Sequence, residues 1–157
     1  MGADDFAWAE GLRRAHFPPD RNLVPAHITL FHHLPPSLLP ELAVRMKMLC
    51  AERAPAAQLS AIMPLGHGVA YRVDSDALIA IREELSAAFA GLLVPQDEAR
   101  PRLHITVSNK IDPQSARALA SALRADFRPR RLQIAGLAAW YYRGGPWELA
   151  VKARFRG

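Results

Sequence analysis

Two short motifs of the same pattern constrain this chain more than any other feature of its sequence. Residues 27–30 read His-Ile-Thr-Leu, and residues 104–107 read His-Ile-Thr-Val. Thr29 and Thr106 are the only threonines among the 157 residues, and each follows a histidine by two positions. Chance would seldom place both threonines in this way, so the pattern predicts a duplicated structural element with one copy in each half of the chain.

Each motif is predicted to lie on a β-strand. Side chains alternate between the two faces of a strand, so His27 and Thr29 would share one face while Ile28 points to the other. The second motif predicts the same arrangement for His104 and Thr106. We therefore expect each motif to present an imidazole and a hydroxyl together on an open face of a sheet whose other face is covered by helices.

The sequence around the motifs predicts an α+β fold. Hydrophobic periodicity and capping residues indicate helices, and short apolar runs bounded by turn residues indicate strands. Helices are expected over residues 4–15, 38–53, 76–90 (with Asp76 as N-cap) and 112–126, strands over residues 58–63, 69–73, 131–142 and 147–155, and a loop over residues 95–101. Both halves thus repeat helix, motif strand, helix and hairpin. This repetition predicts a single domain, residues 1–157, of two pseudo-symmetric lobes, approximately residues 1–75 and 76–157, with elements free to exchange between them.

The composition is that of a soluble globular domain, with 50% apolar and 22% charged residues. Apolar stretches end well before the roughly 20 residues that a membrane helix needs, and the first residues do not resemble a secretory signal. We therefore expect a cytoplasmic protein that does not associate with membranes. Cys50 is the only cysteine, and its apolar neighbours predict a buried thiol without a redox role.

The paired imidazoles indicate acid–base chemistry. An imidazole titrates near pH 6.5, so at neutral pH one ring can accept a proton while another donates one. Two such rings on either side of a phosphodiester would catalyse its in-line cleavage without a metal or another cofactor. The threonine hydroxyls would donate hydrogen bonds to the non-bridging oxygens. The candidate catalytic residues are therefore His27, Thr29, His104 and Thr106.

The twin motifs resemble those of the two-histidine phosphoesterase superfamily, which includes bacterial 2'-5' RNA ligase-like proteins and cyclic nucleotide phosphodiesterases. The resemblance covers most of the chain. It implies two lobes of antiparallel sheet flanked by helices, with one motif per lobe facing a central cleft, and it implies that the four motif residues are the catalytic set. It also implies that the substrate is a nucleotide or RNA-end phosphodiester such as a 2',3'-cyclic phosphate. Some members of the superfamily run the reaction in the direction of ligation.

Two features differ from the ligase-like branch of that superfamily. Its members commonly begin with a strand, whereas the periodicity of residues 4–15 predicts a helix. They often carry an aromatic residue and an arginine five positions after their respective motif histidines, where this chain has His32 and Asn109. These differences weaken the link to RNA ligation in particular and leave the identity of the substrate open.

Three further residues are candidates for substrate binding. Continued alternation would place Phe31 and Lys110 on the open faces, where Phe31 would stack on a base and Lys110 would pair with a phosphate. Arg72, in the predicted hairpin, would also reach the phosphate. For each of the three, the alternative is an ordinary structural role at the end or the surface of a sheet.

Two other interpretations stay open at this point. The first is a zinc site, formed by His27, His32 and His33 with His16 or His67. Against it, the spacing of these histidines matches no common ligand set, and no carboxylate lies close by in the sequence. The second is a non-catalytic RNA- or nucleotide-binding module. The two intact motifs argue against it, because pure binding does not require two protonatable side chains. The leading interpretation is a monomeric, metal-independent phosphodiesterase whose substrate is a nucleotide or an RNA end.

Overall fold

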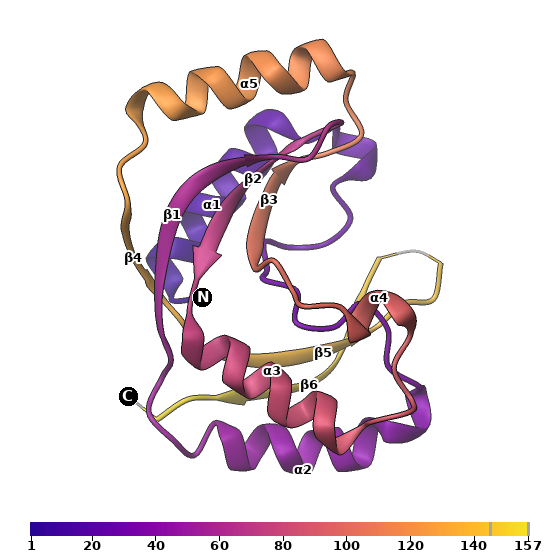
Figure 1. The fold of residues 1–157 in the computed structure, drawn as a ribbon. Helices are drawn as coiled ribbons and strands as arrows, with labels where there is room; N and C mark the ends of the chain where they lie inside the picture. The colour runs from indigo at the N-terminus through magenta and orange to yellow at the C-terminus, as the bar shows by residue number, and fades with distance from the viewer. Residues whose placement is uncertain (145, 157) are drawn as a thin grey trace. The chain divides into compact units, whose positions relative to one another are not determined.

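The computed structural model describes residues 1–144 and 146–156 and contains helices and antiparallel strands (Figure 1). The elements are α1 (Ala3–His16), two short 3-10 helices (Pro19–Arg21 and Pro36–Leu38), α2 (Leu39–Leu49), β1 (Ala56–Pro64), β2 (Val69–Asp74), α3 (Asp76–Ala88), α4 (Pro95–Glu98), β3 (His104–Ser108), α5 (Pro113–Asp126), β4 (Arg130–Gln133), β5 (Gly136–Tyr141) and β6 (Glu148–Arg154). None of the helices found in the described ranges has the length and apolar character needed to cross a membrane.

The chain divides into two compact units, each made of three segments. The first unit consists of Met1–Ile28, Gln58–Asp74 and Arg102–Leu132, and the second consists of the remaining segments. Each unit includes residues from both sides of position 75, so neither coincides with an expected lobe. Both motif histidines belong to the first unit, and Thr29 is the first residue of the second. The division therefore differs from the expectation of one complete motif in each lobe.

A four-stranded sheet lies at the centre of the first unit. Its strand order is β3-β2-β1-β4, and β2 is antiparallel to both β1 and β3. The hairpin predicted from the two apolar runs is therefore confirmed as β1 and β2. The register between β2 and β3 places His104 opposite Arg72 and Ile105 opposite Tyr71. Since β3 is an edge strand, half of its backbone polar groups have no strand to bond with on the outer side.

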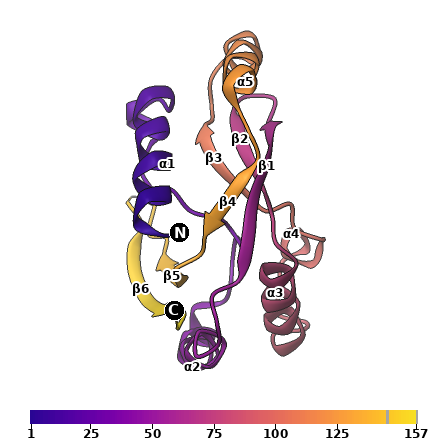
Figure 2. The ribbon, with the colours of Figure 1, turned by 90° about the vertical axis from the view of Figure 1, so that its left-hand side faces the viewer.

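Helices cover the face of this sheet that carries Tyr71. The Tyr71 ring packs edge-on against Trp8 of α1 and against Phe127, which follows α5, with ring centroids 4.9 and 5.6 Å apart. Figure 2 shows α1 running alongside the sheet. Ile105 lies on the same face as Tyr71 and is fully buried, so its neighbour His104 points to the opposite face.

Two helices begin at side chains that bond their first backbone amides. Asp112 accepts hydrogen bonds from two amides at the start of α5, at 2.9 and 3.0 Å, which confirms the predicted start of this helix. The sequence predicted Asp76 as the N-cap of α3, and this is wrong: the N-cap is Ser75. The Ser75 backbone is extended and its hydroxyl accepts from the Leu78 N–H at 3.1 Å, whereas Asp76 is already helical.

The second unit packs α2 and α3 against the antiparallel hairpin of β5 and β6. Its buried core consists of Leu42, Met46, Cys50, Leu85, Phe89, Leu137 and Ala153. Burial raises the pKa of the Cys50 thiol, which keeps this cysteine protonated and unreactive at neutral pH. The prediction of a buried thiol is confirmed.

The structure corrects three local predictions. The first motif does not lie on a strand, because residues 22–35, all of which are described, contain none. The expected loop at 95–101 contains the short helix α4, which Pro95 begins as the first helical residue. The strand expected over 131–142 is divided into β4 and β5, which belong to different sheets.

Alanine should have opposite effects at two glycines of the first unit. A Cβ at Gly68 would lie 2.2 Å from the Ser108 carbonyl oxygen and 2.7 Å from the Asn109 Cα, so Gly68→Ala must displace the end of β3. We expect it to lower the free energy of unfolding by about 1–3 kcal/mol. At Gly11 in α1, apart from its two chain neighbours and the nearby helix backbone, no described atom lies within 4 Å of that position. Gly11→Ala should therefore raise the free energy by about 0.5–1 kcal/mol. Urea denaturation measures both changes, and equal destabilisation would contradict the prediction.

Candidate active site

β3 presents His104 and Thr106 on the sheet face opposite the helices. The intervening Ile105 and the following Val107 are fully buried, whereas His104 and Thr106 are partly exposed. The predicted alternation is therefore confirmed for the second motif. Beyond Thr106 an irregularity shifts the register with β2, and Ser108 is buried like Val107. The alternation ends there.

The first motif is held by α1 instead of by a strand ladder. The Glu10 carboxylate accepts a hydrogen bond from the backbone N–H of Ala26, the residue before His27. Backbone groups that have no neighbouring strand must find other partners when they are buried, and Ala26 is buried. Glu10 therefore fixes the backbone immediately before the first motif.

Arg13 joins the same segment to the edge of the sheet. Its buried guanidinium donates to the Asn22 side chain at 2.7 Å and to the Val24 carbonyl at 2.8 Å. It also donates to the Thr106 carbonyl at 2.8 Å. Because β3 is the edge strand, this arginine occupies the position where a further strand would otherwise bond. One side chain of α1 therefore connects the segment before the first motif to the strand that carries the second.

Both motif histidines bond to a backbone carbonyl two residues earlier in the chain. His27 Nδ1 lies 2.7 Å from the Pro25 oxygen, and His104 Nδ1 lies 2.6 Å from the Arg102 oxygen. A carbonyl oxygen can only accept a hydrogen bond, so Nδ1 carries a proton in each ring. In the neutral form the basic lone pair is then on Nε2, which is the atom that gains or loses a proton.

The surroundings of His27 favour its neutral form. His27 is exposed, yet nearby protein atoms exclude enough water that desolvation is the largest effect lowering its pKa. The hydrogen bond to the Pro25 carbonyl is the second-largest effect and raises the pKa, as Glu10 does to a lesser extent. Positive charges on Arg13 and on His104 lower the pKa, and the net result is a lowered pKa. The effect of His104 indicates that the two motif imidazoles are close enough for the protonation of one to influence the other.

Two candidates from the first half of the chain belong to the second unit. Thr29 is partly buried, and its contact with a substrate phosphate stays a prediction. Phe31 packs partly against the apolar core of this unit, and the Arg82 guanidinium lies over its ring, 5.0 Å from the centroid. The strand alternation that placed Phe31 on an open face is wrong, because the segment is not a strand. Its stacking on a base stays a prediction.

Of the two basic candidates, Arg72 lies beside a motif histidine. It is opposite His104 in the antiparallel pair, where Cβ atoms are about 4.5–5.5 Å apart. Its side chain is exposed and donates to Asp74 at 2.8 Å. Lys110 lies beyond the end of β3 in a left-handed conformation, with φ at 60°. The continued alternation that placed it on the open face is therefore wrong, and its binding to phosphate stays a prediction.

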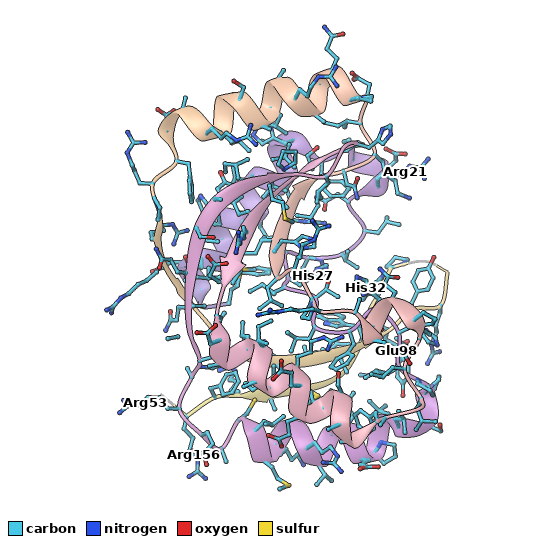
Figure 3. All side chains as sticks on the ribbon, viewed as in Figure 1. Arg21, His27, His32, Arg53, Glu98 and Arg156 are labelled. Atoms are coloured by element: carbon cyan, nitrogen blue, oxygen red, sulfur yellow. The ribbon has the colours of Figure 1, made fainter. Side chains whose placement is uncertain are left out.

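In the second unit, a buried carboxylate fixes the residues that follow the first motif. Asp97 of α4 is 1% exposed and accepts hydrogen bonds from the backbone amides of His32 and His33 and from His32 Nδ1, at 2.8–3.0 Å. Burial alone would raise the pKa of Asp97, but these hydrogen bonds outweigh it and lower the pKa. His32 lies beside α4 with its ring half-exposed (Figure 3). Asp97 thus fixes the ring at the position where the ligase-like branch often has an aromatic residue.

The zinc interpretation receives no support from the side-chain positions. Within residues 1–144 and 146–156, no three His, Cys, Asp or Glu side chains come together in a way that would hold a metal ion. His32 bonds to Asp97, and His67 Nδ1 lies 3.2 Å from the Ile111 carbonyl. These two rings are engaged in hydrogen bonds within the protein.

Sequence reasoning missed Glu10, Arg13 and Asp97. Arg13 had a recognisable signal, because it follows the buried Ala9 by four positions and therefore shares the core-facing side of α1. An arginine on such a face needs buried partners. Asp97 had no such signal, since its partner His32 is 65 positions away in the sequence.

Comparison with known proteins identifies the family. No curated protein matches the chain. The family model of the 2'-5' RNA ligase superfamily matches residues 3–146, a range that includes both motifs and the α1 side chains that hold the first motif. The chain therefore belongs to the 2'-5' RNA ligase superfamily, a family of two-histidine phosphoesterases.

Proposed function

We propose that this chain is a metal-independent phosphodiesterase that hydrolyses a cyclic phosphodiester, such as a nucleoside or RNA 2',3'-cyclic phosphate. Its superfamily supports a phosphoesterase or ligase-like activity. The observation that carries the proposal is the pair of His27 and His104, which lie in one unit and share one tautomer, and of which the charge of His104 lowers the pKa of His27. A protein that only binds RNA has no need for two matched proton carriers.

In the proposed reaction His27 is the base and His104 is the acid. Nε2 of neutral His27 takes a proton from water, and the water oxygen attacks phosphorus as one bond between phosphorus and a ribose oxygen breaks. The Nε2 proton of charged His104 passes to the leaving ribose oxygen, and the product is a phosphomonoester. The lowered pKa of His27 supports this assignment, because it keeps the lone pair available at neutral pH.

Neighbouring donors would hold the phosphate oxygens. The Thr106 side chain shares a strand face with His104, and Arg72 lies opposite His104 on the next strand. A hydroxyl and a guanidinium both donate hydrogen bonds to non-bridging oxygens, which carry additional negative charge in the transition state. Thr29 would make the equivalent contribution from the first motif.

Replacing either motif histidine tests the mechanism. His27→Ala and His104→Ala should each lower kcat by about 10²- to 10⁴-fold, because each removes a proton carrier. His67→Ala, at an exposed turn of the same unit, is the matched control and should retain activity. Rates are measured on nucleoside 2',3'-cyclic phosphates, ADP-ribose cyclic phosphate and 2'-5' linked oligonucleotides, with and without EDTA. Full activity in either motif variant, or loss of wild-type activity in EDTA, would refute the mechanism.

The same substrates separate the enzyme from a binding module. A non-catalytic RNA- or nucleotide-binding protein would bind members of the panel without forming product, and its affinity would not require both histidines. Product formation from at least one substrate excludes this alternative. The preferred substrate also distinguishes cyclic phosphates from 2'-5' linkages.

The pH dependence of the rate follows from the surroundings of His27. Its protonated form cannot act as a base, so kcat/KM should fall on the acid side with an apparent pKa below the ordinary imidazole value of about 6.5. On the alkaline side the rate should fall as the acid histidine loses its proton, which gives a bell-shaped profile. An NMR titration of the His27 ring checks the assignment independently. A His27 pKa at or above 6.5 would contradict it.

Arg72 is expected to contribute to substrate binding. Arg72→Met should raise KM roughly tenfold, because it removes a charge-assisted hydrogen bond to the phosphate. Arg72→Lys keeps the charge and should have a smaller effect. Arg117→Met, at an exposed position of α5, is the matched control and should leave KM unchanged. If Arg72→Met has the wild-type KM, Arg72 does not bind the substrate.

A further inference from the structure

The position of His27 needs an explanation that its own segment does not provide. A strand holds His104 through a backbone ladder with β2, and this ladder defines where the ring points. Residues 22–28 are all described and include no strand. A catalytic ring must be held within a fraction of an ångström of its productive position. Some other part of the molecule must therefore hold the backbone before His27.

We propose that Glu10 and Arg13 of α1 are positioning residues that hold the His27 segment against the edge of β3. This inference rests on the proposed function, because it concerns the same pair of histidines. Neither side chain is proposed to touch the substrate. They act on the reaction through the backbone that carries His27.

The hydrogen bonds converge on the residues immediately before His27. Glu10 accepts from the Ala26 N–H, and Arg13 donates to the Val24 carbonyl at 2.8 Å, so one side chain bonds an amide of the segment and the other bonds a carbonyl. The His27 ring then bonds to the Pro25 carbonyl, between these two anchors. Fixing Val24 and Ala26 therefore also fixes the acceptor that orients the ring.

Arg13 also relates this segment to the second motif. Its third strong acceptor is the Thr106 carbonyl at 2.8 Å, on the strand that carries His104. Arg13 is 2% exposed, and a residue so deeply buried needs partners for its charge. Its two terminal nitrogens are hydrogen-bonded, and Nε lies 3.8 Å from the Glu10 carboxylate without a hydrogen bond. The planar group supplies several donors in fixed directions, which a lysine ammonium on a flexible stem does not reproduce. The spacing between the two motif segments thus depends on one rigid group.

The two positioning residues have opposite electrostatic effects on His27. Arg13 lowers the pKa of His27 and Glu10 raises it, and the two side chains form an ion pair of 3.8 Å. His104 also acts on the ring and lowers its pKa. Variants that separate position from charge therefore give different signatures in the rate and in the pH profile. If the two residues had only a structural role, variants that keep the charge and variants that remove it would not differ in their pH profiles.

Variants of Arg13 provide the first test. Arg13→Lys keeps the positive charge but loses the planar group with its fixed donor directions. We therefore expect kcat to fall on the order of 10- to 100-fold, with a smaller change in KM. Arg13→Met should lower kcat at least as much and should also move the acid limb of the pH profile upward relative to Arg13→Lys. Arg14→Lys and Arg14→Met alter the next residue of the same helix, which is exposed, and should keep wild-type kinetics.

Variants of Glu10 provide the second test. Glu10→Gln retains an oxygen that accepts from the Ala26 N–H, so kcat should stay within a few-fold of wild type while the pKa of His27 falls. Glu10→Ala removes the acceptor, so kcat should fall and hydrogen exchange at the Ala26 amide should become faster. The Ala26 exchange rate and the His27 titration are both measured by NMR on the folded protein and need no substrate.

The outcomes separate this inference from the proposed function. If wild-type protein turns over no substrate of the panel, the proposed function fails, while Ala26 exchange and His27 titration still test whether Glu10 and Arg13 hold the segment. Wild-type kcat in both Arg13→Lys and Glu10→Ala would overturn the inference. It would also be overturned if the loss of kcat in each variant equalled the loss of folded protein, measured by NMR, with no change in the pH profile.

Discussion

The buried guanidinium of Arg13 is the contact on which the arrangement of the first unit depends. It extends from α1 and bonds to three oxygens from two other parts of the chain: the segment before the first motif supplies two, and the edge strand β3 supplies the third. A charge withdrawn from water needs such partners, and both terminal nitrogens of the guanidinium have them. The same contacts close the outer edge of the sheet, where unbonded carbonyls would otherwise invite another chain. One side chain therefore contributes both to packing at the sheet edge and to the position of the backbone before His27.

Two nearly identical tetrapeptides have different backbone environments in this fold. The second motif lies in a strand paired with β2, and the first lies outside any strand, directly after a segment that side chains of α1 bond. Both nevertheless orient the imidazole in the same way, by a hydrogen bond to the carbonyl two residues earlier. The orientation of each ring is thus local to its tripeptide, whereas the relative position of the two segments is a property of the unit.

This distinction explains which features could be predicted from the sequence. The periodicity of residues 4–15 and the Asp112-Pro113 start of α5 depend on neighbours within a few positions, and both predictions are confirmed. Whether residues 27–30 have a partner strand depends on the rest of the fold. The same alternating pattern therefore predicted the strand correctly at β3 and wrongly at residues 27–30. The bond from Arg13 to Thr106 joins residues 93 positions apart, which no local pattern reports.

The matched tautomers of His27 and His104 bear on the direction of catalysis. After one proposed turnover the proton has moved from one ring to the other, and neither Nδ1 bond has to break for this exchange. In the product state His27 is then protonated and His104 is neutral, the reverse of the starting state. By microscopic reversibility, the proposed site would also catalyse re-formation of the cyclic phosphate from the phosphomonoester, with the two histidines exchanging roles. Joining of ends would require a ribose hydroxyl in place of water as the nucleophile. The supply of water or of a ribose hydroxyl to the site would determine the net direction, and the two rings impose none.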